Sequence, residues 1–200
     1  GNIVSAEGIL PDPEKVRAVQ EWPVPNNLTA VRAFVALAAY YRRFIKDFAK
    51  VARPLYDLAK KGYRFCWGPE QQVAFETLKD RLTTAPVLVP PMDGQEYILD
   101  TDCSNVSAGA VLQQRQNGEI KVIAYASRVL NEAELAYCTT RKELAALIFG
   151  LKQFRHYLLL TDFTLRVDHS ALTSLLRTPE PVGQAARWLE FLADYRFKIV

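Results

Sequence analysis

The sequence predicts an α+β or α/β protein in which a small helical bundle is followed by a mixed five-stranded sheet flanked by helices. Three observations support this fold class. In the first part of the chain, apolar residues recur at three- and four-residue steps, as on the buried side of a helix. From residue 96 onward, short β-prone runs alternate with turn signals. A helical run at 140–157 separates two of these strands, which favours a parallel pair.

The chain is expected to begin with a hairpin over residues 1–10 that turns at 6–8 and has unpaired edges. A helix starts at Asp12, with Pro13 in its first turn. It ends near Trp22, because the prolines that follow cannot continue a helix.

Asn27 or Thr29 caps the next helix, and a third helical piece ends near Lys61. The apolar stripe that runs through this region comprises Val31, Phe34, Ala38, Tyr41, Phe44 and Phe48. Three helices with a proline-marked corner predict a small bundle.

A linking segment over 62–91 contains one helix at about 69–81 and then an extended stretch. The stretch is extended because prolines, and the residues before them, avoid helix. We place the domain boundary near residue 92 and expect Trp67 to anchor the core between the two parts.

The second domain is predicted from strands, turns and helices in alternation. Its expected strands are 96–104, 108–115, 120–126, 163–168 and 194–200, with helices at 140–157 and 170–176 and around 187–192. Asn117-Gly118 is a strong signal for the hairpin between the second and third strands. The crossover helix predicts that the strand at 163–168 pairs in parallel with the first.

Acidic residues stand at the ends of two of these strands. Alternation places Asp100 and Asp102 on one face of the first strand, with Asp100 as the rival candidate for a site. A buried carboxylate is penalised unless it is paired, protonated or bound to a metal, so Asp102 is a site candidate. Glu143 shares a helical stripe with apolar residues, and Asp168 ends the fourth strand.

Three carboxylates that converge need a compensating charge, and their hard oxygen atoms suit Mg²⁺ or Mn²⁺. Asp102, Glu143 and Asp168 therefore predict a two-metal phosphodiester site. Two alternatives stay open. Glu143 could be an exposed acid near a helix N-terminus, and Asp168 could cap the helix that follows it.

The net charge of +3 arises from 25 Lys and Arg against 22 Asp and Glu. Basic residues gather between residues 41 and 64, which carry only two acids, Asp47 and Asp57. We expect the candidates for nucleic-acid contact to be Arg42, Arg43, Lys46, Lys50, Arg53, Lys60 and Lys61. The alternative is an ordinary solvated helix face.

The three cysteines lack C-x-x-C spacing, so we interpret them as reduced packing residues rather than as a zinc site or a disulfide framework. No apolar run is long enough to span a membrane and no signal peptide is recognisable, which predicts an intracellular protein.

Ordered motifs along nearly the whole chain resemble the reverse transcriptase of gypsy-type LTR retrotransposons, from the polymerase thumb to the RNase H domain. The matching runs are Ile3–Ile9, Asp12–Val16, Trp22–Pro25, Tyr40–Ile45, Phe65–Trp67, Gln71–Lys79, Leu82–Leu88, Ile98–Leu112, Tyr125–Arg128, Thr140–Leu144, Phe154–Tyr157 and Val167–His169.

The resemblance implies four parts: a palm-end hairpin (1–10), a helical thumb (11–61), a connecting segment (62–91) and an RNase H-like domain (92–200). In the family, the paired aspartates of the polymerase would precede residue 1, and a fourth metal-binding Asp would follow residue 200. The resemblance therefore implies a chain that is truncated at both ends, without a polymerase site and without the last helix of the RNase H domain. It also predicts low or absent nuclease activity for this chain alone.

The implied activity is hydrolysis of the RNA strand of an RNA–DNA hybrid by two Mg²⁺ or Mn²⁺ ions held by Asp102, Glu143 and Asp168. Implied partners are the hybrid or template-primer and the rest of the polymerase, in the cytoplasm, a virus-like particle or the nucleus, with dimerisation left open. The alternatives are a non-catalytic binding or scaffold module of the same fold and, less favoured by the motifs, an integrase-type nuclease.

Overall fold

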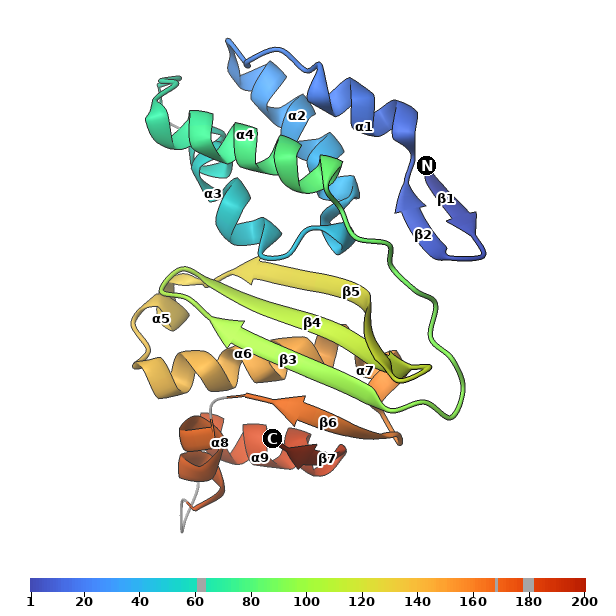
Figure 1. Cartoon of the computed structure of the whole chain (residues 1–200). Helices are drawn as coiled ribbons and strands as arrows, with labels where there is room; N and C mark the ends of the chain where they lie inside the picture. Colours follow the sequence, from blue (N-terminus) through green and yellow to red (C-terminus); the bar gives the residue numbers. More distant parts are fainter. Residues whose placement is uncertain (61–63, 168, 178–181) are drawn as a thin grey trace.

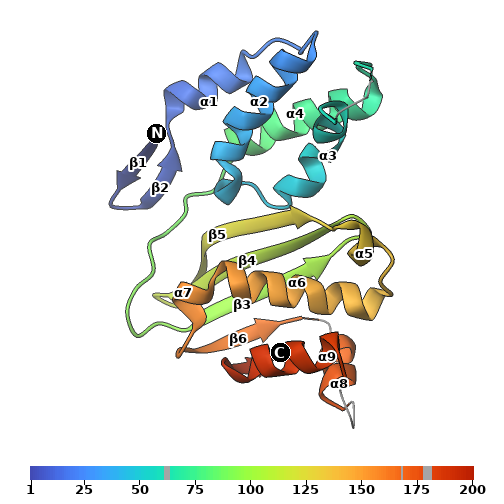
Figure 2. The same cartoon turned by 180° about the vertical axis from the view of Figure 1, so that it is seen from behind.

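In the computed structural model, which describes residues 1–60, 64–167, 169–177 and 182–200, a five-stranded sheet lies between two groups of helices (Figures 1 and 2). One group is a bundle formed by the first 83 residues, and the other comes from the second half of the chain. The predicted fold class is confirmed. No helix in the described ranges is long and apolar enough to cross a membrane.

The first two helices of the bundle are capped by the residues that precede them. The elements here are β1 (Asn2–Ser5), β2 (Gly8–Pro11), α1 (Pro13–Gln20) and α2 (Leu28–Tyr40). The Asp12 carboxylate accepts a hydrogen bond from the backbone N–H of Glu14, and the Asn27 side chain accepts one from Ala30. Of the two caps considered for α2, Asn27 is therefore the one used.

The long apolar stripe does not belong to continuous helices. After α2 the chain forms η1 (Arg42–Phe44), turns, and begins α3 (Phe48–Leu58); α4 (Pro69–Thr83) follows. Asp47, which precedes α3, has left-handed backbone dihedrals of φ 56° and ψ 32°. Tyr41, Phe44 and Phe48 are nevertheless buried, so the stripe predicted the core correctly and the helix boundaries wrongly.

The bundle has a core of its own around Phe34, Tyr41 and Leu55. Trp67 packs within this core, against Phe75 of α4, and donates its indole N–H to Gln72 at 2.8 Å. It therefore does not anchor the junction between the two parts as we predicted. The hairpin edge also differs from prediction, because Ile9 of β2 pairs with Leu88 in the linking segment.

The sheet has the strand order β5-β4-β3-β6-β7. Its strands are β3 (Tyr97–Cys103), β4 (Ser107–Gln116), β5 (Glu119–Val129), β6 (Asp162–Arg166) and β7 (Arg196–Ile199). β3 to β5 are antiparallel, and β6 pairs in parallel with β3, as the crossover helix predicted. Asn117 and Gly118 both have positive φ, which is the backbone of the expected hairpin turn.

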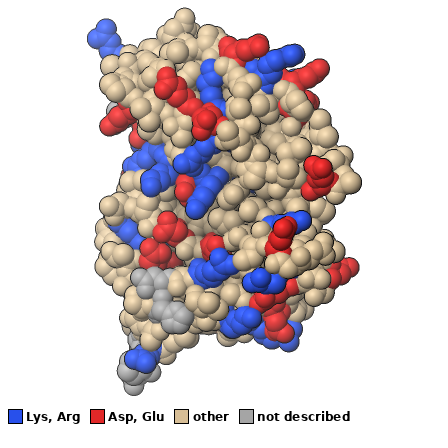
Figure 3. Space-filling view, in the orientation of Figure 1, with Lys and Arg blue, Asp and Glu red and all other residues tan. Residues whose placement is uncertain are grey.

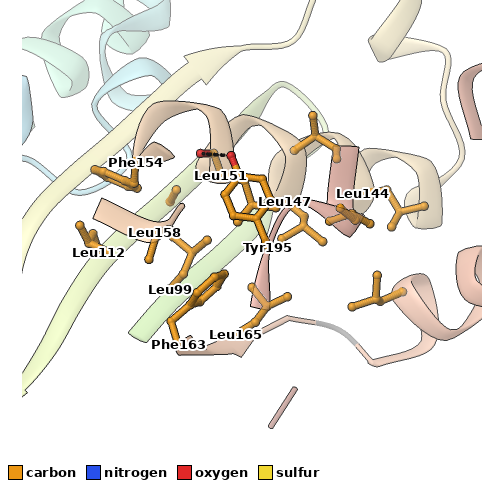
Figure 4. Close-up of a cluster of buried hydrophobic side chains, with 14 of the residues drawn as sticks. Leu99, Leu112, Leu144, Leu147, Leu151, Phe154, Leu158, Phe163, Leu165 and Tyr195 are labelled. Carbon is orange, nitrogen blue, oxygen red and sulfur yellow. Dashed lines mark hydrogen bonds between the residues drawn. The ribbon is translucent and has the colours of Figure 1, made fainter. Parts of the chain in front are cut away.

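Helices from the second half of the chain cover one face of the sheet (Figure 2). They are α5 (Glu132–Leu135), α6 (Thr139–Gln153), α7 (Arg155–Leu158), α8 (His169–Leu176) and α9 (Gln184–Ala193). The predicted helix at 140–157 is interrupted at Phe154, and α5 was not predicted. Leucines from α6 meet Leu99 and Leu165 of the sheet, where the Tyr195 hydroxyl donates to the carbonyl of Leu151 at 3.3 Å (Figure 4).

The bundle lies on the opposite face of the sheet, against β5 (Figure 1). Leu99, Thr101 and Ala110 face Gly150 of α6, whereas the next residue along, Gly109, faces Asp47 of the bundle. Because side chains alternate along a strand, the bundle and α6 must cover opposite faces.

Candidate active site

Asp102 lies near the end of β3 and is exposed to solvent. It pairs with Gly109 of β4, which pairs in turn with Ser127 of β5, so these three residues form one row across the sheet. We expected Asp102 to be buried, and this prediction is wrong. Asp102 is exposed because Gly109, its neighbour on β4, has no side chain to cover it. An exposed carboxylate remains open to a cation and to a phosphodiester.

The half-buried acid of this strand is instead Asp100, the rival candidate. Its Oδ2 accepts a hydrogen bond of 2.6 Å from Gln113, and its buried Oδ1, which accepts no hydrogen bond, lies 3.6 Å from Nε of Arg166. These neighbours already compensate the carboxylate, as a half-buried charge requires. We therefore interpret Asp100 as a structural acid held by its cross-strand partners.

Glu143 comes from α6 on the other side of the strand end. It is half-buried, and Leu147, Gly150 and Phe154 of its stripe are buried, as the helical spacing predicted. Burial, followed by the nearby carboxylates of Glu143 and Asp102, raises the pKa of the Cys103 thiol to about 11. Both carboxylates therefore act electrostatically on the Cys103 thiol, although they come from different elements.

Asp168, the third predicted ligand, lies outside the described residues, and so does Lys61. Within the described residues, no three acidic, His or Cys side chains form a metal-binding group. Asp102 and Glu143 still fit a hard cation, since Mg²⁺ is commonly held by one or two carboxylates together with waters and substrate phosphates. Sulfur is a poor ligand for such an ion, and the raised pKa keeps the Cys103 thiol protonated.

The basic residues of the bundle fall into two groups. Exposed side chains, which can reach a phosphate, belong to Arg42, Lys46, Lys50 and Lys60, the last of which also contacts Asp57 at 2.6 Å. Arg43 and Arg53 are half-buried; Nη1 of Arg53 contacts the carbonyl of Val106 at 3.5 Å. Figure 3 shows Lys and Arg gathered at mid-height on the left of this face, over α3 and above a group of acidic side chains.

The cysteines of the chain differ in exposure. All three cysteines are free thiols, but Cys66 and Cys138 are exposed, so only Cys103 is a packing residue. A hollow of about 980 Å³ lies at the other end of β3, between Glu96, Tyr157 and Lys198. The predicted carboxylates do not line it.

Sequence reasoning missed Ser127 and Asp47, which join the bundle to the row of Asp102. The N–H of Ala49 donates a 2.8 Å hydrogen bond to the Ser127 hydroxyl. The one available signal was the run of small residues at 107–110, because a glycine inside a strand often marks a close approach of another segment.

Comparison with known proteins decides the class of this domain. Residues 67–165 match the family described as the RNase H-like domain found in reverse transcriptase. The chain carries an RNase H-like domain of the reverse transcriptase type. This match includes β3 and α6, the elements that position Asp102 and Glu143, and most of β6.

Relatives of the RNase H-like chain are transposon polyproteins. It is 40% identical over 200 residues to the retrovirus-related Pol polyprotein from transposon 297 of Drosophila melanogaster, and covers 18% of that protein. It is 35% identical over 204 residues to the Tf2-3 polyprotein of Schizosaccharomyces pombe, and covers 15% of it. In both cases the whole chain is aligned, so it corresponds to less than a fifth of these relatives.

The fold also matches the solved structure of a foamy viral protease-reverse transcriptase in complex with RNA/DNA hybrid. The TM-score is 0.81 with 21% sequence identity, over 100% of this chain and 28% of the other. At this identity the likeness establishes the fold of the bundle and the sheet together.

Proposed function

We propose that this chain is the RNase H part of a gypsy-type retroelement reverse transcriptase and that it hydrolyses the RNA strand of RNA–DNA hybrids. The observation that carries the proposal is the match of residues 67–165 to the RNase H-like domain, which includes Asp102 on β3 and Glu143 on α6. The similarity to transposon Pol polyproteins supports the same function.

In this proposal, Asp102, Glu143 and Asp168 hold two Mg²⁺ or Mn²⁺ ions. When bound, such ions activate a water and stabilise the oxygen that leaves the phosphorus. Asp102, which is exposed, faces the substrate side, and Glu143 closes the site from α6. Water adds to the phosphorus and the bond to the 3′ oxygen breaks, leaving a 5′-phosphate and a 3′-hydroxyl.

The exposed basic residues of the bundle grip the hybrid through its phosphates. Arg42, Lys46 and Lys50 are the side chains free to make these contacts. The hybrid is distinguished from DNA by its groove shape and by the 2′-hydroxyls of its RNA strand. A foamy viral protease-reverse transcriptase of similar fold has been solved in complex with RNA/DNA hybrid and also with dsDNA, which supports a nucleic-acid duplex as the partner.

A second candidate is a non-catalytic module that binds a hybrid or a partner without cleaving it. One observation favours it: the basic surface over α3 belongs to the bundle and does not depend on the carboxylates of the sheet. Binding could therefore persist without catalysis.

Cleavage of an end-labelled RNA–DNA hybrid with Mg²⁺ or Mn²⁺ separates the two candidates. We expect any cleavage by the chain to be abolished in Asp102→Asn and retained in Asp100→Asn, because Asp100 is already held by Gln113 and Arg166. Equal loss in both variants would contradict the assignment of Asp102. Salt-sensitive binding without cleavage in the unmodified chain would favour the non-catalytic module.

A further inference from the structure

We propose that Ser127 is a positioning residue that fixes the bundle onto the strand row of Asp102, so that RNA is cut at a set distance from the duplex held by the bundle. This inference rests on the proposed function and adds a rule for where the cut falls. It is carried by the contacts of the first turn of α3 with β4 and β5.

The first turn of α3 is capped from the other half of the protein. A helix usually receives its cap from the residue just before it, whose side chain accepts a hydrogen bond from an N–H of the first turn. Asp47 occupies that position and makes no such bond. The N–H of Ala49 donates instead to the hydroxyl of Ser127, at 2.8 Å, although the two residues lie 78 positions apart.

Ser127 belongs to the same row as Asp102. It pairs with Gly109, and Gly109 pairs with Asp102, so all three face the same side of the sheet. Neighbouring strands lie about 4.8 Å apart, which puts Ser127 and Asp102 about 10 Å from each other. The start of α3 is therefore anchored two strands away from the candidate catalytic carboxylate.

Gly109 makes room for this approach. A Cβ at this position would lie 2.9 Å from Oδ1 of Asp47, closer than a carbon and an oxygen normally pack. The left-handed backbone of Asp47 brings its side chain down onto the middle of the row. A side chain at position 109 would therefore require the Asp47 carboxylate to turn away from the row.

This contact fixes the positions of the basic residues nearest to it. Lys46 and Lys50 flank the capped turn and are exposed, and Arg81 of α4 donates to the carbonyl of Lys46. Arg53, one turn further along α3, reaches the carbonyl of Val106 in the turn that follows β3. Contacts with Ser127 of β5 and with the turn between β3 and β4 therefore hold this part of α3.

A rigid junction of this kind fixes the distance between the lysines that bind the duplex and the candidate catalytic carboxylate. When Lys46 and Lys50 hold two phosphates of a duplex, the position of Asp102 relative to that duplex is fixed. One phosphate of the RNA strand is then presented to Asp102 and Glu143, and its neighbours are not. Loosening the junction should spread the cuts over adjacent phosphates.

The test uses two disrupting variants and a rescuing partner for each. Ser127→Ala removes the cap, and Ser127→Thr keeps the hydroxyl. Gly109→Ala pushes Asp47 away, and the double variant Gly109→Ala with Asp47→Gly removes the obstruction while keeping a residue that tolerates positive φ. Cut positions are mapped on an end-labelled hybrid, and the thermal midpoint of each variant is recorded.

A second readout does not depend on cleavage. Spin labels at Arg32→Cys on α2 and Gln153→Cys on α6, both exposed positions, report the distance distribution between the two halves in a chain with Cys66→Ser and Cys138→Ser. Loss of a helix cap should raise the undocked population about fivefold. We expect Ser127→Ala and Gly109→Ala to broaden both the distribution of label distances and the range of cut positions. Ser127→Thr and the double variant at positions 109 and 47 should keep both as narrow as in the original chain.

Each other outcome overturns a defined part of the proposal. Unchanged distances in both disrupting variants would show that these contacts do not fix the bundle. Broadened distances with an unchanged cut pattern would show that the docked bundle does not set the cut. If the unmodified chain cleaves no hybrid, the proposed function fails, and so does the rule for where the cut falls. The distances between the spin labels still show whether Ser127 holds the bundle on the sheet.

Discussion

Arg128 and Glu134 show how one residue pair orders the segment that leads into α6. Two hydrogen bonds of 2.6 and 2.7 Å join the guanidinium to the carboxylate, whose side chain is 12% exposed. Glu134 also accepts from the N–H of Asn131, completing a capping box for α5. The hydrogen bonds from Arg128 are the main cause of the lowered pKa of Glu134.

Glu134→Gln should reduce the free energy of unfolding at neutral pH by about 1–2 kcal/mol, because a charged hydrogen-bonded pair is lost at a partly exposed site. The lowered pKa means that the carboxylate stabilises the fold above its ordinary pKa of about 4.3 and loses this effect as the pH falls through the lowered value. The difference between the two proteins should therefore shrink in acid.

Urea unfolding at neutral and acidic pH measures this difference. Glu132→Gln is the matched control, since Glu132 lies in the same short helix and is exposed. A Glu132 variant that loses as much stability as the Glu134 variant would contradict the role of the Arg128 pair.

The positions of individual site residues could be predicted where the local sequence pattern determines them. The strand-end position of Asp102 and the helical stripe of Glu143 follow from periods of two and 3.6 residues. Which acid of β3 is half-buried did not follow, because it depends on Gln113 and Arg166, which belong to other strands. Asp168 lies outside the described residues, so its role remains a prediction.

At the level of elements, α6 packs unusually close to the sheet at Gly150. A Cβ there would lie 2.9 Å from Cγ2 of Thr101 and 3.1 Å from Cβ of Ala110. This glycine lets the helix that carries Glu143 approach the strand that carries Asp102.

Gly150→Ala should therefore destabilise the protein by about 1–2 kcal/mol, because overpacking outweighs the gain in helix propensity of up to about 1 kcal/mol. Adding Thr101→Ser, which removes the opposing methyl group, should recover part of the loss. Chemical denaturation of the single and double variants gives both values. A Gly150→Ala variant that is more stable than the original chain would show that the helix is free to move away from the sheet.

Element types were predictable and several boundaries were not. Apolar stripes marked the buried sides of α2, α3 and α6, but they do not record where the backbone breaks. The chain leaves α2 after Tyr40 and interrupts α6 at Phe154 while the buried pattern continues. Tertiary packing sets these breaks, since the same side chains stay buried on either side of them.

For the whole molecule, the arrangement of bundle and sheet places basic residues and carboxylates on neighbouring surfaces. The pairing of β4 with β5 and of β3 with β6 followed from the hairpin signal and the crossover rule, whereas the place of β7 beside β6 was not predicted. The docking of α3 on β5 could not be read from the sequence, because it joins Ala49 to Ser127 across 78 positions.

The combined variant Lys46→Gln/Lys50→Gln should weaken binding of an RNA–DNA hybrid. It should also make the plot of log affinity against log salt less steep by about 1.8, because each phosphate that a lysine no longer neutralises reduces the slope by ~0.9. Fluorescence anisotropy over a salt series measures the slope. Lys15→Gln on α1 is the control, as an exposed lysine remote in sequence from this group. An equal change in that control would mean that binding follows net charge rather than a defined surface.

Mn²⁺ titration followed by NMR tests, without requiring cleavage, whether Asp102 and Glu143 share a cation site. The proposed site predicts paramagnetic broadening first at the amides of Asp102, Cys103 and Glu143, and its loss in Asp102→Asn. Broadening centred instead on Glu96 and Asp162, at the other end of the sheet, or broadening that survives Asp102→Asn, would contradict the proposed active site.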